Sequence, residues 1–205
     1  MTARTVLLWR HGLTEYNLSG RMQGQVDIPL GISGLAHAAR AAAALAEHRP
    51  TAIISSDLSR ALSTAEMLGD LTSLDVRCDA RLRERSFGRF EGLTREEIDE
   101  RWPAELAAWR RGEDVAEVGI EPRAAVAERV AGCVSEAAAG LERQDVLVVV
   151  GHGAAIAAGV TRLMGLPAEG WFGLSSMDNC HWARLRANAP RHPEWLMAAY
   201  NVGVL

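Results

Sequence analysis

Two histidines of this sequence directly follow short apolar runs. His11 stands in RHG after Val6–Trp9, and His152 stands in GHG after VLVVV. A neutral imidazole can attack phosphorus, because one ring nitrogen carries a free lone pair. The neighbouring Arg10 adds a guanidinium, whose planar fork binds phosphate oxygens bidentately. These residue types indicate the chemistry of phosphoryl transfer, with His11 as the candidate nucleophile.

Phosphoryl transfer also needs further cations at the phosphate and an acid for the leaving oxygen. Arg60, in SDLSRALSTA, is predicted to lie in the first turn of a helix, where its side chain and the N-terminal amides could meet the same anion. Glu84, in LRERSFGRFEG, is the candidate acid, and Glu91 and Asp57 are its competitors. Gly12 would let the backbone pass close to the phosphate.

Segments with strand-like and helix-like patterns alternate along the chain. Strands are expected at 6–9, 51–57, 74–82, 146–150, 181–187 and 194–201. Helices are expected at 33–48 with Ser33 as N-cap, at 58–71, at 95–102 behind a Thr94–Glu97 capping box, at 103–111 and at 122–143. The alternation predicts a three-layer α/β/α sandwich with a mostly parallel central sheet.

The ends of the most apolar strands bring the candidate residues together. These strands end in RHG, SSD and GHG. In open α/β sheets, ligands bind beyond the carboxyl ends of the strands. Two distant segments are therefore expected to deliver His11 and His152 to the same edge of the sheet, and this edge is the predicted site.

The bulk composition is that of a weakly acidic globular protein. The chain has 205 residues, of which 48% are apolar, and its formal net charge is −4. An acidic protein has no overall attraction for nucleic acid or for an anionic membrane, so neither is expected as a partner. An anionic ligand must then be attracted locally, by a few arginines in one pocket.

Signals for targeting and for metal binding are missing from the sequence. No apolar stretch has the length of a membrane span or the pattern of a signal peptide. Cys78, Cys133 and Cys180 are far apart and odd in number, which argues against a disulfide framework and against a zinc site. No H-x-H or H-E-x-x-H pair is present. We therefore expect a cytoplasmic protein without a metal or an organic cofactor.

Four blocks of the sequence, in order, resemble one enzyme family. RHGLTEYN, SSDLSRALSTAEML, LRERSFGRFEGLT and VVVGHGAAI are similar to the signatures of the histidine phosphatase superfamily, also called phosphoglycerate mutase-like. The resemblance covers nearly the whole chain. It implies a phosphohistidine intermediate on His11. It also implies that Arg10, Arg60 and His152 hold the phosphate and that Glu84 donates a proton.

The resemblance implies further pocket residues and a lid. Asn17, Arg21, Gln23 and Gly153 are expected to bind substrate, because they match positions in the signature blocks or positions that line the pocket in relatives. The resemblance also implies one domain over residues 1–205, with a small helical lid over roughly residues 90–121.

One segment departs from the family pattern. Relatives often carry Gly-Glu-Ser before the long helix, whereas this chain has VGIEPRAAVAER there. Glu121 would represent the glutamate of that motif, with Ile120 and Pro122 as its changed neighbours. The contacts made by this segment cannot be carried over from relatives.

Two activities of the family remain open. Thr14 and Tyr16 in RHGLTEYN resemble the phosphatase form of the signature, in which water receives the phosphoryl group. AAWRRGED resembles an element of the mutases, in which a second bound hydroxyl receives it. A third interpretation is a non-catalytic protein that binds a phosphorylated ligand, although all core positions are filled. We expect the phosphatase.

The C-terminal part of the sequence narrows the range of expected substrates. SSMDNCHWARL and AAYNVGVL resemble actinobacterial phosphatases of this family, one group of which acts on glucosyl-3-phosphoglycerate. The resemblance implies a small phosphorylated metabolite, with glucosyl-3-phosphoglycerate or a related phosphoglycerate or sugar phosphate as the first choice. The apolar VGVL end could be a homodimer contact or a packed end.

Overall fold

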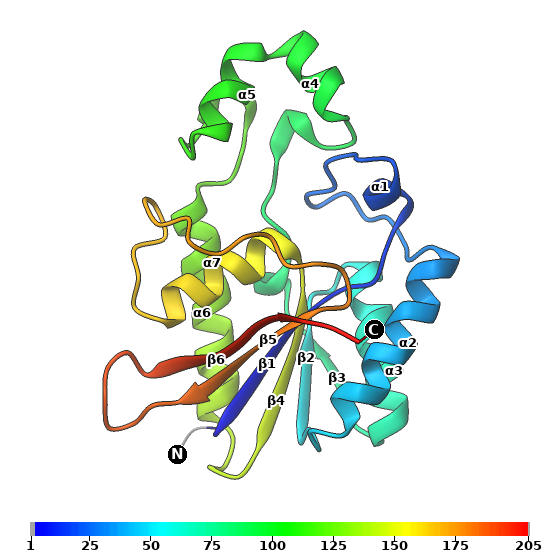
Figure 1. Ribbon diagram of the computed structural model, residues 1–205, viewed down its shortest axis with the longest axis vertical. Helices are drawn as coiled ribbons and strands as arrows, with labels where there is room; N and C mark the ends of the chain where they lie inside the picture. The colour runs from blue at the N-terminus through cyan, green and yellow to red at the C-terminus, as the bar shows by residue number, and fades with distance from the viewer. Residues whose placement is uncertain (1–2, 205) are drawn as a thin grey trace.

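One central sheet carries helices on both of its faces (Figure 1). The computed structural model describes residues 3–204, so the last residue of the VGVL segment lies outside it. The strand order is β3-β2-β4-β1-β5-β6, in which the first four strands are parallel and β5 and β6 are antiparallel. Within residues 3–204 the strands are β1 (Thr5–Arg10), β2 (Ala52–Ser55), β3 (Val76–Cys78), β4 (Val146–Gly151), β5 (Trp182–Ala187) and β6 (Trp195–Val202).

The helices are placed between and beside these strands. Within residues 3–204 they are α1 (Glu15–Leu18), α2 (Ile32–Ala46), α3 (Ser59–Thr72), α4 (Arg95–Arg101), α5 (Pro103–Arg110), α6 (Arg123–Ala139) and α7 (Gly153–Leu163). Short 3-10 turns are η1 (Ala80–Leu82), η2 (Gly88–Phe90) and η3 (Ala116–Val118). None of the helices described between residues 3 and 204 is long and apolar enough to cross a membrane.

Alternation along the central strands separates two apolar cores. On β1, Val6 and Leu8 pack in the core formed with α6 and α7, whereas Leu7 and Trp9 pack in the core formed with α2 and α3. All four side chains are fully buried. The parallel strands are therefore covered on both faces, which explains their continuous apolar runs. The predicted three-layer α/β/α sandwich with a mostly parallel sheet is confirmed.

Helices α4 and α5 stand apart from the sandwich, at the top of Figure 1. They share a third core with the turns around them, which includes Phe90 and Leu106. The predicted capping box is confirmed, since the Thr94 hydroxyl accepts from the Glu97 backbone N–H and the Glu97 carboxylate accepts from the Thr94 N–H. That residues 90–121 act as a lid stays a prediction.

The predicted start of the first long helix is wrong. Ser33 does not cap α2, which begins at Ile32 behind Gly31. The Gly31 N–H donates to the Leu13 carbonyl at 2.9 Å, and the Gly31 carbonyl accepts from the Leu35 N–H at 2.9 Å. A contact with the loop after β1 therefore decides where α2 begins.

Two other predicted elements are too long. Of the predicted strand at 74–82, only Val76–Cys78 pairs with β2. The Asp79 carboxylate then accepts from the Arg81 N–H at 2.9 Å, which starts η1 and ends the strand. The helix predicted at 122–143 ends at Ala139, in the turn that leads into β4.

The loop after β1 packs directly on the start of α2. A Cβ at Gly34 would overlap the backbone of Leu13, and a Cβ at Gly12 would lie 2.7 Å from the Gly34 carbonyl oxygen. Two glycines therefore allow the backbone contact that determines the path of the chain after His11.

We expect Gly34→Ala to lower the free energy of unfolding by about 1–3 kcal/mol, because the added methyl group has no room beside Leu13. Gly132→Ala in α6 is the matched control, since a Cβ there meets nothing within 4 Å. The control should raise the free energy of unfolding by about 0.5–1 kcal/mol, because it removes a glycine from a helix interior. Urea unfolding measures both changes. A stabilised Gly34→Ala protein would contradict the close contact.

Candidate active site

His11 is buried, and one backbone contact determines its tautomer. Its Nδ1 lies 2.6 Å from the Gly12 carbonyl oxygen. Because a carbonyl oxygen only accepts hydrogen bonds, Nδ1 carries the proton and Nε2 keeps its lone pair. Burial, together with the charges of Arg10 and Arg60, lowers the pKa of His11 well below its usual value. The ring is therefore neutral near pH 7 and has a free basic nitrogen.

His152 follows β4 and lies beside the ring of His11. The two ring centroids are 5.1 Å apart. His152 Nε2 lies 2.9 Å from the hydroxyl of Ser56, which follows β2. Burial, with a further contribution from His11, lowers the pKa of His152 well below its usual value. The structure thus brings the ends of β1, β2 and β4 together, and with them both imidazoles.

The buried guanidinium of Arg60 and the partly buried guanidinium of Arg10 lie at the same edge of the sheet. Arg10 donates from Nη1 to the Met177 carbonyl. Arg60 donates from Nη1 and Nη2 to two carbonyls of the loop 24–26, at 2.7 Å each. Burial lowers the pKa of both arginines, and the charge of Glu84 acts in the opposite direction. Each guanidinium is thus held in place by backbone carbonyls.

Three buried nitrogen atoms of these residues have no hydrogen-bond partner within residues 3–204. They are Arg10 Nε, Arg60 Nε and His152 Nδ1. An unpaired buried polar atom costs about 1–3 kcal/mol, so such atoms are rare in a folded protein. Their gathering at one sheet edge fits a ligand that supplies several acceptor atoms, as the oxygens of a phosphate group do.

Gly153 makes room for Arg10 at the start of α7. A Cβ at this position would lie 3.3 Å from Arg10 Cζ and 2.6 Å from the hydroxyl oxygen of Ser176. The absence of a side chain therefore lets the guanidinium lie against the first turn of the helix.

Glu84 lies at the first turn of α7. Its Oε1 accepts from the backbone N–H groups of Arg85 and Ala155, at 2.8 Å each, and its Oε2 accepts from the Ala154 N–H at 3.1 Å. The N-terminus of a helix favours such an anion. Because its charge also acts on Arg10 and Arg60, Glu84 is part of the same electrostatic cluster.

The two competitors of Glu84 bind other groups. Glu91 Oε1 accepts from the backbone N–H groups of Gln25 and Phe87, at 3.1 and 2.9 Å. Asp57 forms a bidentate pair with Arg83, at 2.7 and 2.5 Å. Glu91 therefore holds backbone segments together, and Asp57 neutralises an arginine.

Comparison with known proteins agrees with this arrangement. A family model, "Histidine phosphatase superfamily (branch 1)", matches residues 6–201. The chain belongs to the histidine phosphatase superfamily. A glucosyl-3-phosphoglycerate phosphatase of Mycolicibacterium vanbaalenii is 42% identical to this histidine phosphatase over 193 residues, which cover 90% of this chain and 85% of the relative. A probable phosphoglycerate mutase of Escherichia fergusonii is 34% identical over 174 residues, which cover 80% of this chain and 76% of the relative.

A solved structure has nearly the same fold. A mycobacterial glucosyl-3-phosphoglycerate phosphatase in complex with VO3 matches with a TM-score of 0.90 and 39% sequence identity. The match covers 98% of this chain and 100% of that chain. The prediction of a phosphatase of this superfamily that acts on a small phosphorylated metabolite is confirmed.

In this histidine phosphatase, Asn17 and Gln23 belong to a polar network around the backbone of His11. Asn17 Oδ1 accepts from the Thr14 N–H and from Asn179 Nδ2, at 3.2 Å each. Gln23 Oε1 accepts from the Thr14 hydroxyl at 3.0 Å, and Asn179 Nδ2 also donates to the His11 carbonyl at 3.0 Å. Thr14 and Asn179 were not among the predicted residues. That Asn17 and Gln23 bind substrate stays a prediction.

Arg21 contacts the segment that carries α4. Its Nη1 donates to the Gly92 carbonyl at 2.6 Å and to Glu97 Oε2 at 2.7 Å. Arg21 thus joins the loop after α1 to the capping box of α4, and its guanidinium already has a carboxylate partner. Its predicted role in substrate binding stays a prediction.

Sequence reasoning missed Arg129, which positions the segment before Glu84. From α6, Arg129 donates to the carbonyls of Arg81, Arg83 and Glu84, at 2.7, 2.6 and 3.0 Å. Its Nε and Nη2 also pair with Glu121, at 2.8 Å each. Glu121 stands in the segment that differs from the Gly-Glu-Ser motif of relatives. Its carboxylate is therefore the ion-pair partner of Arg129. No local signal distinguishes Arg129 from other arginines on helix surfaces.

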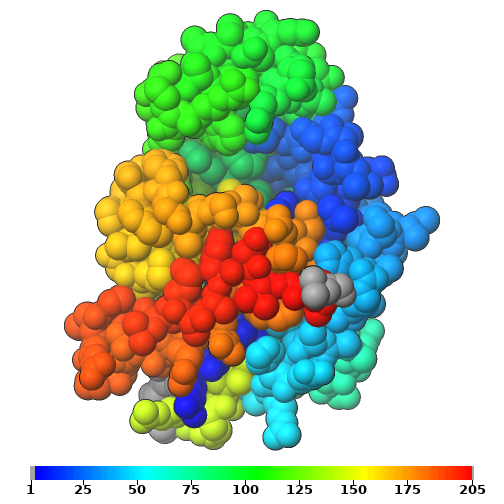
Figure 2. Space-filling model, in the orientation of Figure 1, coloured from blue at the N-terminus to red at the C-terminus, as the bar shows by residue number. Residues whose placement is uncertain are grey.

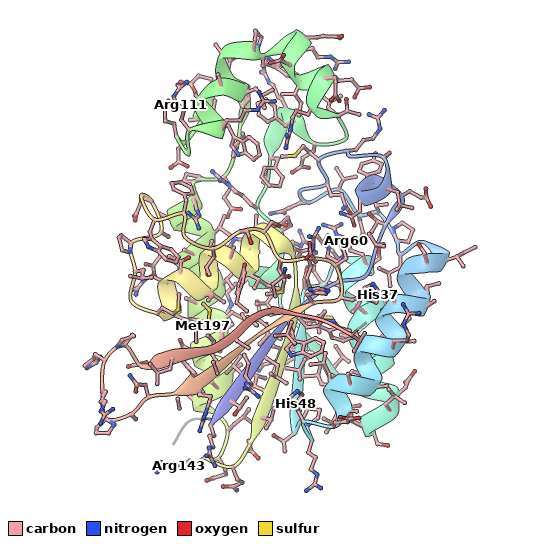
Figure 3. All side chains as sticks on the ribbon, viewed as in Figure 1. His37, His48, Arg60, Arg111, Arg143 and Met197 are labelled. Atoms are coloured by element: carbon pink, nitrogen blue, oxygen red, sulfur yellow. The ribbon has the colours of Figure 1, made fainter. Side chains whose placement is uncertain are left out.

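The surface of the molecule is hollowed below the predicted lid. Figure 2 shows the molecule hollowed between the green residues of α4 and α5 and the yellow and orange residues that follow α7. Figure 3 places Arg60 near this end of the sheet and His48 at the opposite end. Among residues 3–204, no three His, Cys, Asp or Glu side chains form a group that could hold a metal ion.

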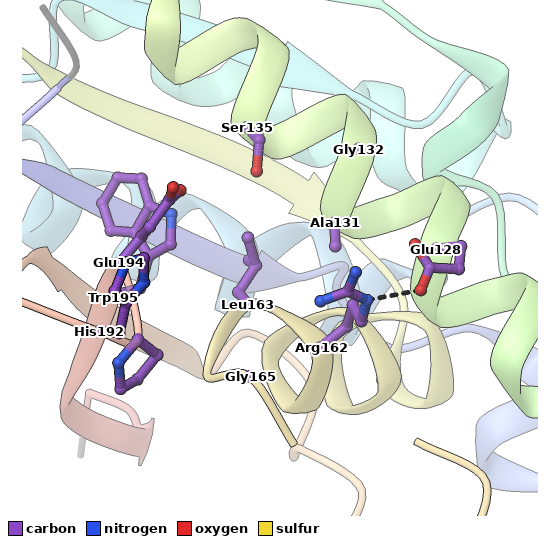
Figure 4. A pocket seen from close by; sticks show the side chains of 11 residues that line it. Glu128, Ala131, Gly132, Ser135, Arg162, Leu163, Gly165, His192, Glu194 and Trp195 are labelled. Carbon is purple, nitrogen blue, oxygen red and sulfur yellow. Dashed lines mark hydrogen bonds and ion pairs between the residues drawn. The ribbon is translucent and has the colours of Figure 1, made fainter. Parts of the chain in front are cut away.

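A separate groove lies away from these residues. It runs between α6, α7 and residues 192–195, has a volume of about 400 Å³ and is crossed by an ion pair of Arg162 with Glu128 at 2.5 Å (Figure 4). None of the predicted site residues lines it. The groove is therefore not the site of the chemistry considered above.

We expect the folded protein to lose stability as the pH falls below about 6.5, the usual pKa of histidine. Burial holds the pKa of His11 and of His152 well below that value, so the unfolded chain binds protons in this range that the folded protein does not. Each histidine then lowers the free energy of unfolding by up to about 1.4 kcal/mol per pH unit, until the pH reaches its folded-state pKa.

Urea unfolding at a series of pH values measures this slope. His152→Gln should reduce the slope, whereas His192→Gln, which removes an exposed imidazole, should leave it as in the unmodified protein. If His152→Gln leaves the pH dependence of the free energy of unfolding unchanged, burial does not lower the pKa of His152.

Proposed function

We propose that this protein hydrolyses the phosphomonoester of glucosyl-3-phosphoglycerate through a phosphohistidine on His11. The observation that carries the proposal is a neutral, buried imidazole with a free Nε2, beside buried nitrogen atoms of Arg10, Arg60 and His152 that lack partners within residues 3–204. The choice of substrate is supported by the 42% identical relative, which is named for its action on glucosyl-3-phosphoglycerate.

In the first step, His11 Nε2 attacks phosphorus in line with the leaving oxygen. The Nδ1–H stays bonded to the Gly12 carbonyl, which orients the ring and stabilises the positive charge that develops on it. An N–P bond forms as the P–O bond to the sugar acid breaks. The guanidiniums of Arg10 and Arg60 stabilise the charge on the other phosphate oxygens.

Glu84 must take up a proton before this step, and it then supplies that proton to the leaving oxygen. Its Oε1 already accepts two backbone N–H bonds at 2.8 Å, whereas Oε2 accepts one, at 3.1 Å, within residues 3–204. Oε2 therefore has more free capacity, and we assign the transferred proton to it.

In the second step, water completes the hydrolysis. Glu84, now ionised, removes a proton from a water molecule, whose oxygen attacks phosphorus. The N–P bond breaks, its electron pair returns to His11 Nε2, and inorganic phosphate leaves. The carboxylate is again protonated, and the imidazole is again neutral, so the cycle needs no further reactant.

A mutase reaction is the second candidate function. It is favoured by the 34% identical relative, a probable phosphoglycerate mutase. Both reactions would share the phosphohistidine on His11. They differ in the acceptor, which is water for the phosphatase and a second bound hydroxyl for the mutase.

Phosphate release with EDTA present tests the proposed function. The substrates are glucosyl-3-phosphoglycerate, 3-phosphoglycerate, sugar phosphates and phosphoserine, and we expect the first to give the highest kcat/KM. His11→Ala should lower turnover by at least about 10³-fold, because it removes the nucleophile. Substantial turnover by His11→Ala would refute the mechanism, and formation of 2-phosphoglycerate without phosphate release would identify a mutase.

The leaving group tests the role of Glu84. We expect Glu84→Gln to slow hydrolysis of glucosyl-3-phosphoglycerate by about 10²-fold or more, because an alkoxide needs a proton to depart. Hydrolysis of p-nitrophenyl phosphate should slow much less, since p-nitrophenolate leaves unprotonated. Glu91→Gln is the control, and it should affect both substrates by the same factor because Glu91 holds backbone groups. Equal losses on both substrates in Glu84→Gln would exclude it as the acid.

A further inference from the structure

Arg123 is a partly buried cation, and among residues 3–204 its side chain has no acidic partner. It begins α6, and its Nη1 donates to the Trp171 carbonyl at 2.6 Å. Its guanidinium carbon lies 4.5 Å from the centre of the Phe172 ring. No ion pair within residues 3–204 includes Arg123. The nearby Asp114 carboxylate instead accepts from the Arg123 backbone N–H and from the side chain of Arg85.

One short backbone segment, residues 171–177, connects Arg123 with the phosphate-binding residues. Three of its carbonyl groups accept hydrogen bonds, in order along the chain, from Arg123, Tyr200 and Arg10. Six residue steps of extended chain reach at most about 20 Å, which limits how far apart the two bonded carbonyls can lie. Burial raises the pKa of Tyr200 to about 12, and the charges of Arg10 and Arg123 both oppose this rise. Tyr200 therefore lies within electrostatic reach of both arginines.

The Phe172 ring connects Arg123 with the chain that follows α5. The Phe172 ring, which covers Arg123 and is 52% exposed, packs against Gly112, where a Cβ would overlap the ring. Gly112 follows α5, so the chain after α5 meets the segment 171–177 at this contact. Arg123 is thus bonded to the same short segment as Arg10, at the place where this segment meets the chain after α5.

We propose that Arg123 binds the carboxylate of the glycerate moiety and so selects phosphomonoesters that carry a carboxylate near the phosphate. The inference rests on the proposed function, because it assigns a partner to the second anionic group of the same substrate. A guanidinium binds a carboxylate through two parallel N–H···O bonds, which are stronger in a partly desolvated site. Arg10 and Arg60 are engaged with the phosphate, so a further cation is needed for this second charge.

Two matched substrates distinguish a loss of carboxylate binding from a general loss of enzyme activity. They are glucosyl-3-phosphoglycerate and glucosylglycerol 3-phosphate, in which a hydroxymethyl group replaces the carboxylate. Arg123→Gln keeps an N–H donor for the Trp171 carbonyl but loses the charge, and Arg123→Lys keeps the charge but loses the planar fork. Arg162→Met is the control, because it removes an exposed arginine from the groove of Figure 4.

We expect Arg123→Gln to lower kcat/KM for glucosyl-3-phosphoglycerate about 10- to 100-fold, mainly through KM. For the carboxylate-free substrate, kcat/KM should change by less than about threefold. Arg123→Lys should lose part of the preference for the substrate that carries the carboxylate. Inhibition by inorganic phosphate should stay the same in both variants, since Arg10 and Arg60 hold the phosphate. Arg162→Met should match the unmodified enzyme.

Equal losses on both substrates, or no loss on either, would overturn the inference and leave Arg123 as a support for residues 171–177. If Arg123→Gln does not fold, the ratio of kcat/KM for the two substrates is measured in Arg123→Lys instead. A ratio in Arg123→Lys as high as in the unmodified enzyme would overturn the inference. Failure of the unmodified enzyme to release phosphate from glucosyl-3-phosphoglycerate would refute the proposed function itself, and the inference with it.

Discussion

The hydrogen bond from His11 Nδ1 to the Gly12 carbonyl is the contact on which the site depends. It keeps the lone pair on Nε2, and it exists only while the backbone turns after β1. The Gly12 N–H donates to Thr64 on α3 at 3.1 Å, and the Thr64 hydroxyl donates to the Arg60 carbonyl at 2.7 Å. Gly34 lets α2 approach the same loop. The loop with His11 and the helix with Arg60 are therefore one hydrogen-bonded unit.

Burial makes these groups reactive and also makes them costly for folding. Two neutral imidazoles, two guanidiniums and a carboxylate share a space from which water is largely removed. Glu84 offsets part of the positive charge, and it is itself held by the first turn of α7. The nitrogens of Arg10, Arg60 and His152 that lack partners in the described part of the chain remain as a cost that an anionic ligand would relieve. The site is thus organised for a phosphate group more than for the stability of the empty protein.

The sheet edge and the segments around it differ in their proposed roles, which are catalysis and substrate selection. The edge with His11 and His152 holds the residues of the proposed mechanism, on a scaffold shared with relatives named as phosphatases and as a mutase. A fold alone does not select a substrate, so selection must come from the borders of the hollow. We proposed Arg123, which lies against Phe172 at the start of α6, as one residue that contributes to this selection.

Patterns within the sequence predicted most of the strands and helices, although they missed the local Asp79 contact that ends β3. Apolar runs before RHG, SSD and GHG predicted strands that end at one edge, and the Thr94–Glu97 spacing predicted the start of α4. The same patterns did not predict that Arg129 holds the Glu84 carbonyl across 45 residues, or that Arg21 contacts Glu97 across 76. Propensity and periodicity reflect the free energies of a few adjacent residues, which determine backbone conformation and the buried face. Which side chains meet across the fold depends on how the layers pack, and only the tertiary structure decided that.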